Sequence, residues 1–156
     1  MTDIVNSADY VIDTSSILSQ KDDRRYRLNV WPTLWNKISD LVKEKRIITC
    51  SEIFEEVQDD LPQKWYNDLN GFVLPINNEI QKKVVEVVTS NPQMINFKQI
   101  KSSGDAFLIA TAMEYNLTVI TEENKDSSKK IPQVCKNLNI PCIDILGLCV
   151  REGWHF

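Results

Sequence analysis

Histidine is nearly absent from this sequence: among its 156 residues only His155, the last but one, is a histidine. A zinc site built from several histidines is therefore excluded, and a Ser-His-Asp or Cys-His nucleophile would depend on this single side chain. If the protein is an enzyme, we expect its chemistry to rest on carboxylates, which suit hard cations such as Mg²⁺ and Mn²⁺.

Three further absences narrow the class of protein. The four cysteines form no C-x-x-C pair, which disfavours a zinc ribbon and favours a reduced, cytoplasmic setting. No apolar run approaches the roughly 18 residues of a membrane span. No basic segment precedes an apolar stretch near residue 1, as it would in a secretory signal. We therefore expect a cytoplasmic protein without a membrane partner.

The sequence also has no excess of positive charge, because 22 acidic residues outnumber 18 lysines and arginines and the formal net charge is −4. Proteins that bind nucleic acid passively through charge are usually strongly basic. The composition therefore argues against that class, but not against an enzyme that meets a phosphodiester through bound cations. No glycine-rich phosphate loop follows the first predicted strand, which disfavours a nucleotide-binding protein with a P-loop or dinucleotide fingerprint.

Short apolar runs alternate with longer amphipathic segments along the chain, which we interpret as one domain, residues 1–156. The pattern predicts strands at 10–14, 46–49, 72–76, 118–121 and 142–145. Helices are expected at 31–42, from about 52 to 59, from 80 to before Pro92, at 104–115, at 132–138 and after 145. The loops are predicted at 91–101 and 122–130. This alternation predicts an α/β fold, a sandwich around a mostly parallel central sheet.

Four local patterns add detail to this prediction. Pro75 indicates an edge strand or a strand end, and Pro32 suits the first turn of its helix. The T-x-x-E pattern of Thr49–Glu52 predicts a capping box. Trp31 and Trp35 fit the apolar stripe of one helix, so we expect both in the core.

Acidic residues gather where the predicted strands end. In "YVIDTSSIL", residues 10–18, a strand runs into Asp13 with three hydroxyl residues behind it, and Glu122 and Glu123 follow the strand at 118–121. Asp105 opens the helix before that strand, and the helix after the second strand carries Glu52, Glu55 and Glu56. Ligands of such sheets bind beyond the carboxyl ends of the strands. Crowded carboxylates repel one another unless a divalent cation joins them, so the pattern predicts a Mg²⁺ or Mn²⁺ site.

Each acid alone also has a structural explanation. Asp13 can cap the following helix, and Asp105 completes an S-x-x-D capping pattern. Glu52 is the acid of the predicted capping box, and the remaining glutamates can face solvent on a helix or a loop. The hypothesis of a metal site therefore depends on the joint placement of these acids.

Taken together, "YVIDTSSIL", the acid after the second strand and "GDAFLIATAMEYNLTVITEE" resemble the PIN domain. The segments "RRYRLNVWPTLW" and "IPQVCKNLNIPCIDILGL" are similar to those of a PIN-like subfamily of small prokaryotic proteins. The resemblance covers nearly the whole chain. It implies a PIN-like fold, which is a Rossmann-like three-layer α/β/α sandwich, and a Mg²⁺- or Mn²⁺-dependent endoribonuclease that hydrolyses RNA phosphodiesters. Many PIN proteins are toxins that pair with an antitoxin protein and form homodimers, so both are implied partners.

The resemblance also implies roles for individual residues. Asp13 matches the first acid and Ser15 the hydroxyl that supports it, while Glu56 best matches the second acid, with Glu52 and Glu55 as alternatives. Asp105 matches the third acid. Thr121 and Glu123 match a T-x-D motif, although this chain has Glu where the family has Asp. The implied catalytic residues are Asp13, Glu56, Asp105 and Glu123, and the implied metal ligands are Asp13, Asp105 and Glu123 or its neighbour Glu122.

A basic segment follows the first strand closely. We expect Arg24, Arg25 and Arg27 to position RNA through its phosphates. The alternative is a surface salt-bridge network with Asp22 and Asp23. A second open alternative concerns the whole protein, which could be an inactive PIN-like binding module that acts through a protein partner.

Overall fold

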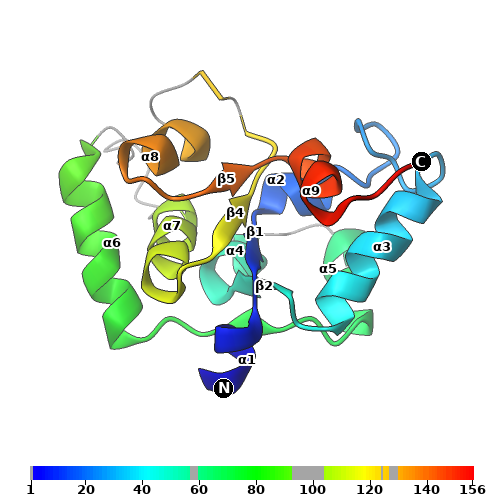
Figure 1. The fold of residues 1–156 in the computed structure, drawn as a ribbon. Coiled ribbons are helices and arrows are strands. Elements are labelled where there is room, and N and C mark those ends of the chain that lie inside the picture. Colours follow the sequence, from blue (N-terminus) through cyan, green and yellow to red (C-terminus); the bar gives the residue numbers. More distant parts are fainter. Residues whose placement is uncertain (1, 57–59, 93–103, 124, 127–129) are drawn as a thin grey trace.

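The computed structural model describes residues 2–56, 60–92, 104–123, 125–126 and 130–156 (Figure 1). Within these residues five strands form one parallel sheet in the order β3-β2-β1-β4-β5. The strands are β1 (Tyr10–Ile12), β2 (Ile47–Cys50), β3 (Val73–Leu74), β4 (Thr118–Ile120) and β5 (Cys142–Ile143). The chain builds outward from β1 to β3 and then returns to the other side of β1 with β4. The order of strands therefore reverses between β1 and β4, and such reversals are where α/β sheets bind ligands.

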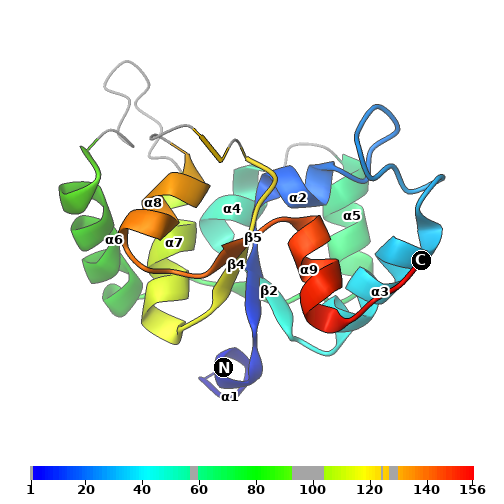
Figure 2. The same cartoon turned by 45° about the horizontal axis from the view of Figure 1, so that its top comes forward.

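Helices cover both faces of the sheet, so the predicted three-layer α/β/α sandwich is confirmed (Figures 1 and 2). One face carries α4 (Ser51–Glu56), α6 (Asn78–Ser90), α7 (Gly104–Tyr115) and α8 (Ile131–Asn137), and α1 (Thr2–Ser7) packs at the edge of the same core through Val5. The other face carries α2 (Thr14–Leu18), α3 (Pro32–Lys43), α5 (Asp60–Asp68) and α9 (Ile145–Glu152).

The alternation of strand residues explains why two cores form. Val11 of β1 packs into the core beneath α7, whereas its neighbours Tyr10 and Ile12 pack into the core beneath α3 and α9. Successive side chains of a strand point to opposite faces, and both faces of a parallel sheet are covered. The strands of this sheet are therefore mostly apolar on both faces.

Several sequence-based details are confirmed. Pro32 is in the first turn of α3, and Pro75 directly follows β3, which is an edge strand. Trp35 is 1% exposed. Its indole N–H donates to the Tyr26 carbonyl oxygen. The expected loop at 91–101 lies outside the described residues from position 93 onward.

Two local expectations were wrong. Thr49 does not cap a helix: it is a buried residue of β2, its hydroxyl donates to the Ile12 carbonyl oxygen over 3.0 Å, and α4 begins at Ser51. The T-x-x-E pattern is present, but its threonine is used by the sheet. Trp31 is not in the core but 39% exposed, because it precedes α3 rather than lying on its inner face.

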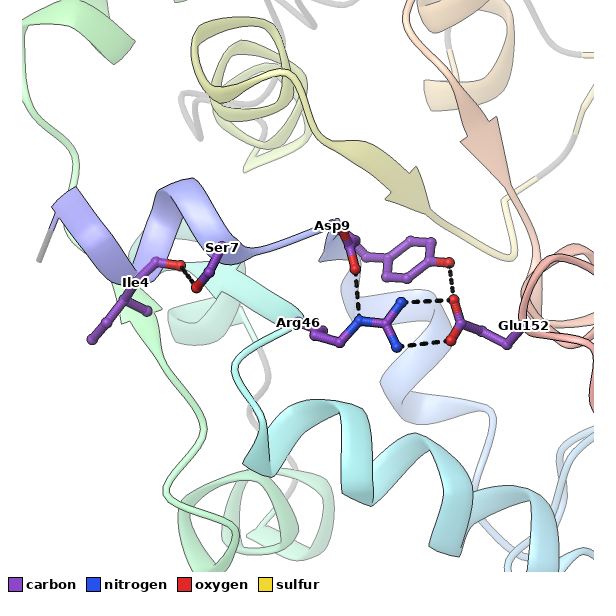
Figure 3. A network of polar contacts seen from close by, with 6 residues as sticks. Ile4, Ser7, Asp9, Arg46 and Glu152 are labelled. Carbon is purple, nitrogen blue, oxygen red and sulfur yellow. Dashed lines mark hydrogen bonds and ion pairs between the residues drawn. The ribbon is translucent and has the colours of Figure 1, made fainter.

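An ion-pair network joins the amino end of the sheet to α9 (Figure 3). The Arg46 Nε atom lies 2.6 Å from Asp9 Oδ2, and its two terminal nitrogens lie 2.9 and 3.0 Å from the carboxylate oxygens of Glu152. The Tyr10 hydroxyl also donates to Glu152. Burial alone would raise the pKa of Glu152, but the hydrogen bonds from Arg46 and Tyr10 outweigh it and lower that pKa. This network occupies the end of the sheet opposite to Asp13.

Among the described helices, none has the length and apolar character needed to cross a membrane. All four cysteines are free thiols.

Candidate active site

Asp13 is buried at the centre of the carboxyl rim, which is the edge of the sheet formed by the carboxyl ends of its strands. It directly follows β1 and is only 2% exposed. Although Asp13 precedes α2, its side chain makes no capping hydrogen bond to that helix. Instead, Asp13 Oδ2 accepts hydrogen bonds from the Ser15 hydroxyl over 2.7 Å and the Thr121 hydroxyl over 2.9 Å. Helix capping, which the sequence left open, therefore does not account for this carboxylate.

The two hydroxyls also connect Asp13 to the backbone that follows β4. Ser15 Oγ accepts a hydrogen bond from the Glu122 N–H over 2.9 Å, and Thr121 Oγ1 accepts one from the Glu123 N–H over 3.2 Å. Each hydroxyl thus donates to the carboxylate and accepts from the backbone, and such chained hydrogen bonds strengthen one another. The ends of β1 and β4 are held together at the reversal of strand order.

Glu122 and Glu123 are half-buried and diverge toward different helices. Glu122 Oε1 accepts a hydrogen bond from the Ile145 N–H over 2.7 Å, at the start of α9. Glu123 Oε2 accepts one from the Ile131 N–H over 3.1 Å, at the start of α8. The alternative that both face solvent on a loop is therefore wrong.

The electrostatic surroundings separate the two glutamates further. Burial raises the pKa of Glu123, and the negative charge of Asp13 raises it again, while a side-chain hydrogen bond with Asp105 opposes them. Burial also raises the pKa of Glu122, but the acid that adds to this effect is Asp144. Asp13, Asp105 and Glu123 therefore share one acidic neighbourhood, and Glu122 shares another with Asp144.

Burial likewise raises the pKa of Asp13, and the hydrogen bonds from Ser15 and Thr121 only partly oppose it. Within the described part of the chain, no lysine or arginine forms an ion pair with Asp13. A buried carboxylate without a counter-charge is poorly stabilised as an anion, and a bound cation is the usual remedy.

Ser15, Thr121 and Glu123 offer oxygen ligands near Asp13, which match the preference of Mg²⁺ and Mn²⁺. Among the described residues, however, no three His, Cys, Asp or Glu side chains stand close enough to hold a metal ion as they are. Glu123 is engaged by α8, which is one physical reason for this. The carboxylates of Asp13, Asp105 and Glu123 have the chemistry that a divalent cation needs, while in this structure Glu123 is held by the start of α8.

The second acid of the predicted site stays a prediction. Glu56 is the last residue of α4, and its side chain lies outside the described residues. Glu52 is half-buried and Glu55 is exposed on the same helix. The Thr14 hydroxyl donates to the Ile53 carbonyl oxygen over 3.3 Å, so α4 lies beside the segment that carries Asp13.

The three arginines that were predicted to position RNA have different surroundings in the structure. Arg24 pairs with Asp23 over 3.5 Å, and both side chains are exposed, as the salt-bridge alternative expected. The positive charge of Arg25 lowers the pKa of Glu122, so Arg25 approaches the rim. Arg27 is exposed.

Sequence reasoning missed Asp144 near the rim, and the structure also places Tyr26 and Lys125 there. Burial and the charge of Glu122 raise the pKa of Tyr26, which also shares a hydrogen bond with Arg25. Asp144 accepts a hydrogen bond from the Gly147 N–H over 2.7 Å, and its other oxygen lies 3.0 Å from Lys125 Nζ. A signal for Asp144 existed, because it follows β5 as Asp13 follows β1.

Several solved structures share this fold. PAE2754 from Pyrobaculum aerophilum is 16% identical, with a TM-score of 0.53 over 94% of this chain and 90% of that one. VapBC-1 from nontypeable Haemophilus influenzae is 13% identical, with a TM-score of 0.55 over 88% of this chain and 98% of that one. FitAcB from Neisseria gonorrhoeae is 13% identical, with a TM-score of 0.51 over the same shares. At such identities the likeness shows the fold alone.

Comparison with curated protein sequences gave no match. A family model described as a domain of unknown function, DUF4411, matches residues 10–156. The match begins at β1 and contains every residue assigned above to the rim. The chain therefore belongs to the DUF4411 family, and its fold is PIN-like.

Proposed function

We propose that this protein is a Mg²⁺- or Mn²⁺-dependent endoribonuclease that hydrolyses RNA phosphodiesters at the carboxyl rim of its sheet. The observation that carries the proposal is the buried Asp13 carboxylate, which Ser15 and Thr121 hold at the reversal of strand order and which has no ion-pair partner among the described residues. Its position beside Asp105 and Glu123 supports a role in metal binding rather than in stability.

In this proposal Asp13, Asp105 and Glu123 hold the cation, and Glu56 completes the acidic ring. A bound divalent cation would supply an activated water and stabilise negative charge on a phosphoryl oxygen. The hydroxyls of Ser15 and Thr121 keep the Asp13 carboxylate in one orientation. Arg25, whose charge lowers the pKa of Glu122, contacts a phosphate of the substrate.

Asp13→Asn tests this proposal because asparagine keeps the shape of the side chain and removes its charge. Purified wild-type protein should cleave unstructured RNA in Mn²⁺ or Mg²⁺ and lose this activity in EDTA, whereas Asp13→Asn should be at least 100-fold slower. Circular dichroism verifies that the variant is folded. Full activity of Asp13→Asn would refute the assignment of the site.

Calorimetry with Mn²⁺ separates the nuclease from the inactive binding module. A nuclease should bind Mn²⁺ at a specific site that Asp13→Asn abolishes. An inactive module should show no such binding in either protein, and its RNA cleavage should equal the background of a mock purification.

We further propose that the protein is the toxin of a toxin–antitoxin pair, which the similarity to the VapBC-1 and FitAcB structures supports. Induced expression of the wild type should then arrest bacterial growth, and expression of Asp13→Asn should not. Co-expression of an adjacent small gene should relieve the arrest and yield a stable complex. Light scattering of the purified protein tests the implied homodimer.

A further inference from the structure

A cavity of about 370 Å³ opens beyond the carboxyl end of β5, between α8 and the start of α9. It adjoins the acidic centre, because Thr121, which donates to Asp13, forms part of its wall. The lining residues are Thr121, Lys125, Pro132, Gln133, Lys136, Cys142, Ile143, Asp144 and Gly147. The roles assigned to Asp13, Asp105, Glu123 and Glu56 leave this cavity unused.

The walls of the cavity combine apolar surface with a few polar groups. Pro132, Cys142 and Ile143 provide the apolar part. The Gln133 amide nitrogen donates to the Lys125 carbonyl oxygen, which leaves its own carbonyl oxygen as an acceptor. The Asp144 carboxylate also lines the cavity; its oxygens accept from the Gly147 N–H and the Lys125 ammonium, and their remaining lone pairs make it a second acceptor. Such walls suit a flat heterocycle that stacks on apolar surface and donates hydrogen bonds from its edge.

Two ammonium groups border the cavity and differ in their pairing. The charge of Lys125 is compensated by Asp144, 3.0 Å away. Lys136 of α8 is exposed and forms no ion pair with any other described residue. An uncompensated ammonium at the mouth of a largely apolar cavity attracts an anion such as a phosphate.

We propose that this cavity binds one nucleotide of the RNA strand next to the phosphate that is cut at Asp13, with Lys136 on its phosphate and an amino-bearing base against Gln133 and Asp144. This inference rests on the proposed function, because the shared residue Thr121 makes the cavity the neighbouring subsite. The two acceptors favour cytosine over uracil, since the two bases differ at the amino group of C4.

Calorimetric titration of the full-length wild-type protein with CMP and with UMP tests the subsite without any RNA cleavage. CMP should bind saturably and at least fivefold more tightly than UMP. Lys136→Ala should weaken CMP binding about tenfold, and Gln133→Ala should remove the preference for CMP. Lys82→Ala, on the exposed side of α6, is the matched control and should leave CMP binding unchanged.

The thiols offer a second measurement. Cys142 lines the cavity, while Cys149 is equally half-buried but does not. CMP should slow the alkylation of Cys142 by iodoacetamide, measured by mass spectrometry, and leave that of Cys149 unchanged.

The outcomes separate this inference from the proposed function. Absence of saturable CMP binding, or equal affinity for CMP and UMP, overturns the subsite even if RNA is cleaved. CMP binding with protection of Cys142 supports the subsite even if no RNA is cleaved, in which case the nuclease proposal fails alone.

Discussion

The hydroxyl of Thr121 donates a hydrogen bond to Asp13 over 2.9 Å, although the two residues are 108 positions apart in the chain. Removing this donor should leave the buried carboxylate with one hydroxyl partner fewer. We therefore expect Thr121→Val to lower the free energy of unfolding by about 1–3 kcal/mol, measured by urea denaturation. Thr121→Ser keeps the hydroxyl and should cost less than half as much. Equal losses in both variants would contradict a role for the hydroxyl.

The pH dependence of stability should reveal the charge on Asp13. Burial raises its pKa in the folded state, so the folded protein binds more protons than the unfolded one between the unfolded pKa near 4 and the raised folded pKa. The contribution of Asp13 to stability is therefore fully present below about pH 4 and is lost as the pH rises through the folded pKa.

It follows that Asp13→Asn should melt about 2–4 °C above the metal-free wild type at pH 7, which corresponds to about 1 kcal/mol. The difference should shrink as the pH falls toward about 4. Excess Mn²⁺ should raise the melting temperature of the wild type only. A variant less stable than the wild type at pH 7 in EDTA would contradict this account.

The two adjacent glutamates should respond differently to loss of charge. Glu123→Gln removes an acid from the neighbourhood of Asp13, so we expect at least a tenfold loss in Mn²⁺ affinity and in RNA cleavage. Glu122→Gln keeps an oxygen that can accept from the Ile145 N–H at the start of α9 and should change Mn²⁺ affinity little. Calorimetry with Mn²⁺ on both variants shows which glutamate binds the metal. A large loss of affinity in Glu122→Gln but not in Glu123→Gln would assign the metal to Glu122.

Arg25 and Arg24 form a matched pair for RNA binding. Arg25 approaches the rim, whereas Arg24 pairs with Asp23 in solvent. Arg25→Ala should weaken RNA binding and reduce the slope of log affinity against log salt by about 1, since each phosphate contact releases about one counterion. Arg24→Ala should change neither. The binding should be measured in the Asp13→Asn background, where RNA stays intact.

The Arg46 network at the amino end of the sheet should stabilise the folded protein. Arg46→Ala would leave the carboxylates of Glu152 and Asp9 without their shared partner. Glu152 is largely buried, so we expect a loss of about 1–3 kcal/mol in the free energy of unfolding. Lys64→Ala breaks an exposed pair with Asp68 and should cost less than about 0.5 kcal/mol. Equal costs would mean that burial does not strengthen the Arg46 network.

The sequence predicted the layered fold because its apolar runs alternate regularly, and it predicted the position of Asp13 and Glu123 at the rim because both follow strands. It did not predict α2, since five residues are too few to show a helical period. The same limit explains the error at Thr49, where a capping pattern overlaps the end of a buried strand.

The distinction between Glu122 and Glu123 was also beyond the sequence. Their directions depend on where α8 and α9 begin, and those helix starts lie several to more than twenty residues further along the chain. Arg25 differs from Arg24 for a similar reason, because only the path of the loop before α3 decides which side chain faces the rim. Contacts between residues that are far apart in the chain cannot be predicted from the spacing of neighbouring residues.

Helix α9 is anchored at both of its ends. Its first N–H is held by Glu122 at the rim, and its last residue, Glu152, is held by Arg46 at the foot of the sheet (Figure 3). Eight helical residues span about 12 Å, so the helix connects the carboxyl rim to the amino end of the sheet. Residues 145–156 therefore help to hold the rim in place. Removing them would free the Glu122 side chain from its hydrogen bond to α9 without changing any acid of the site.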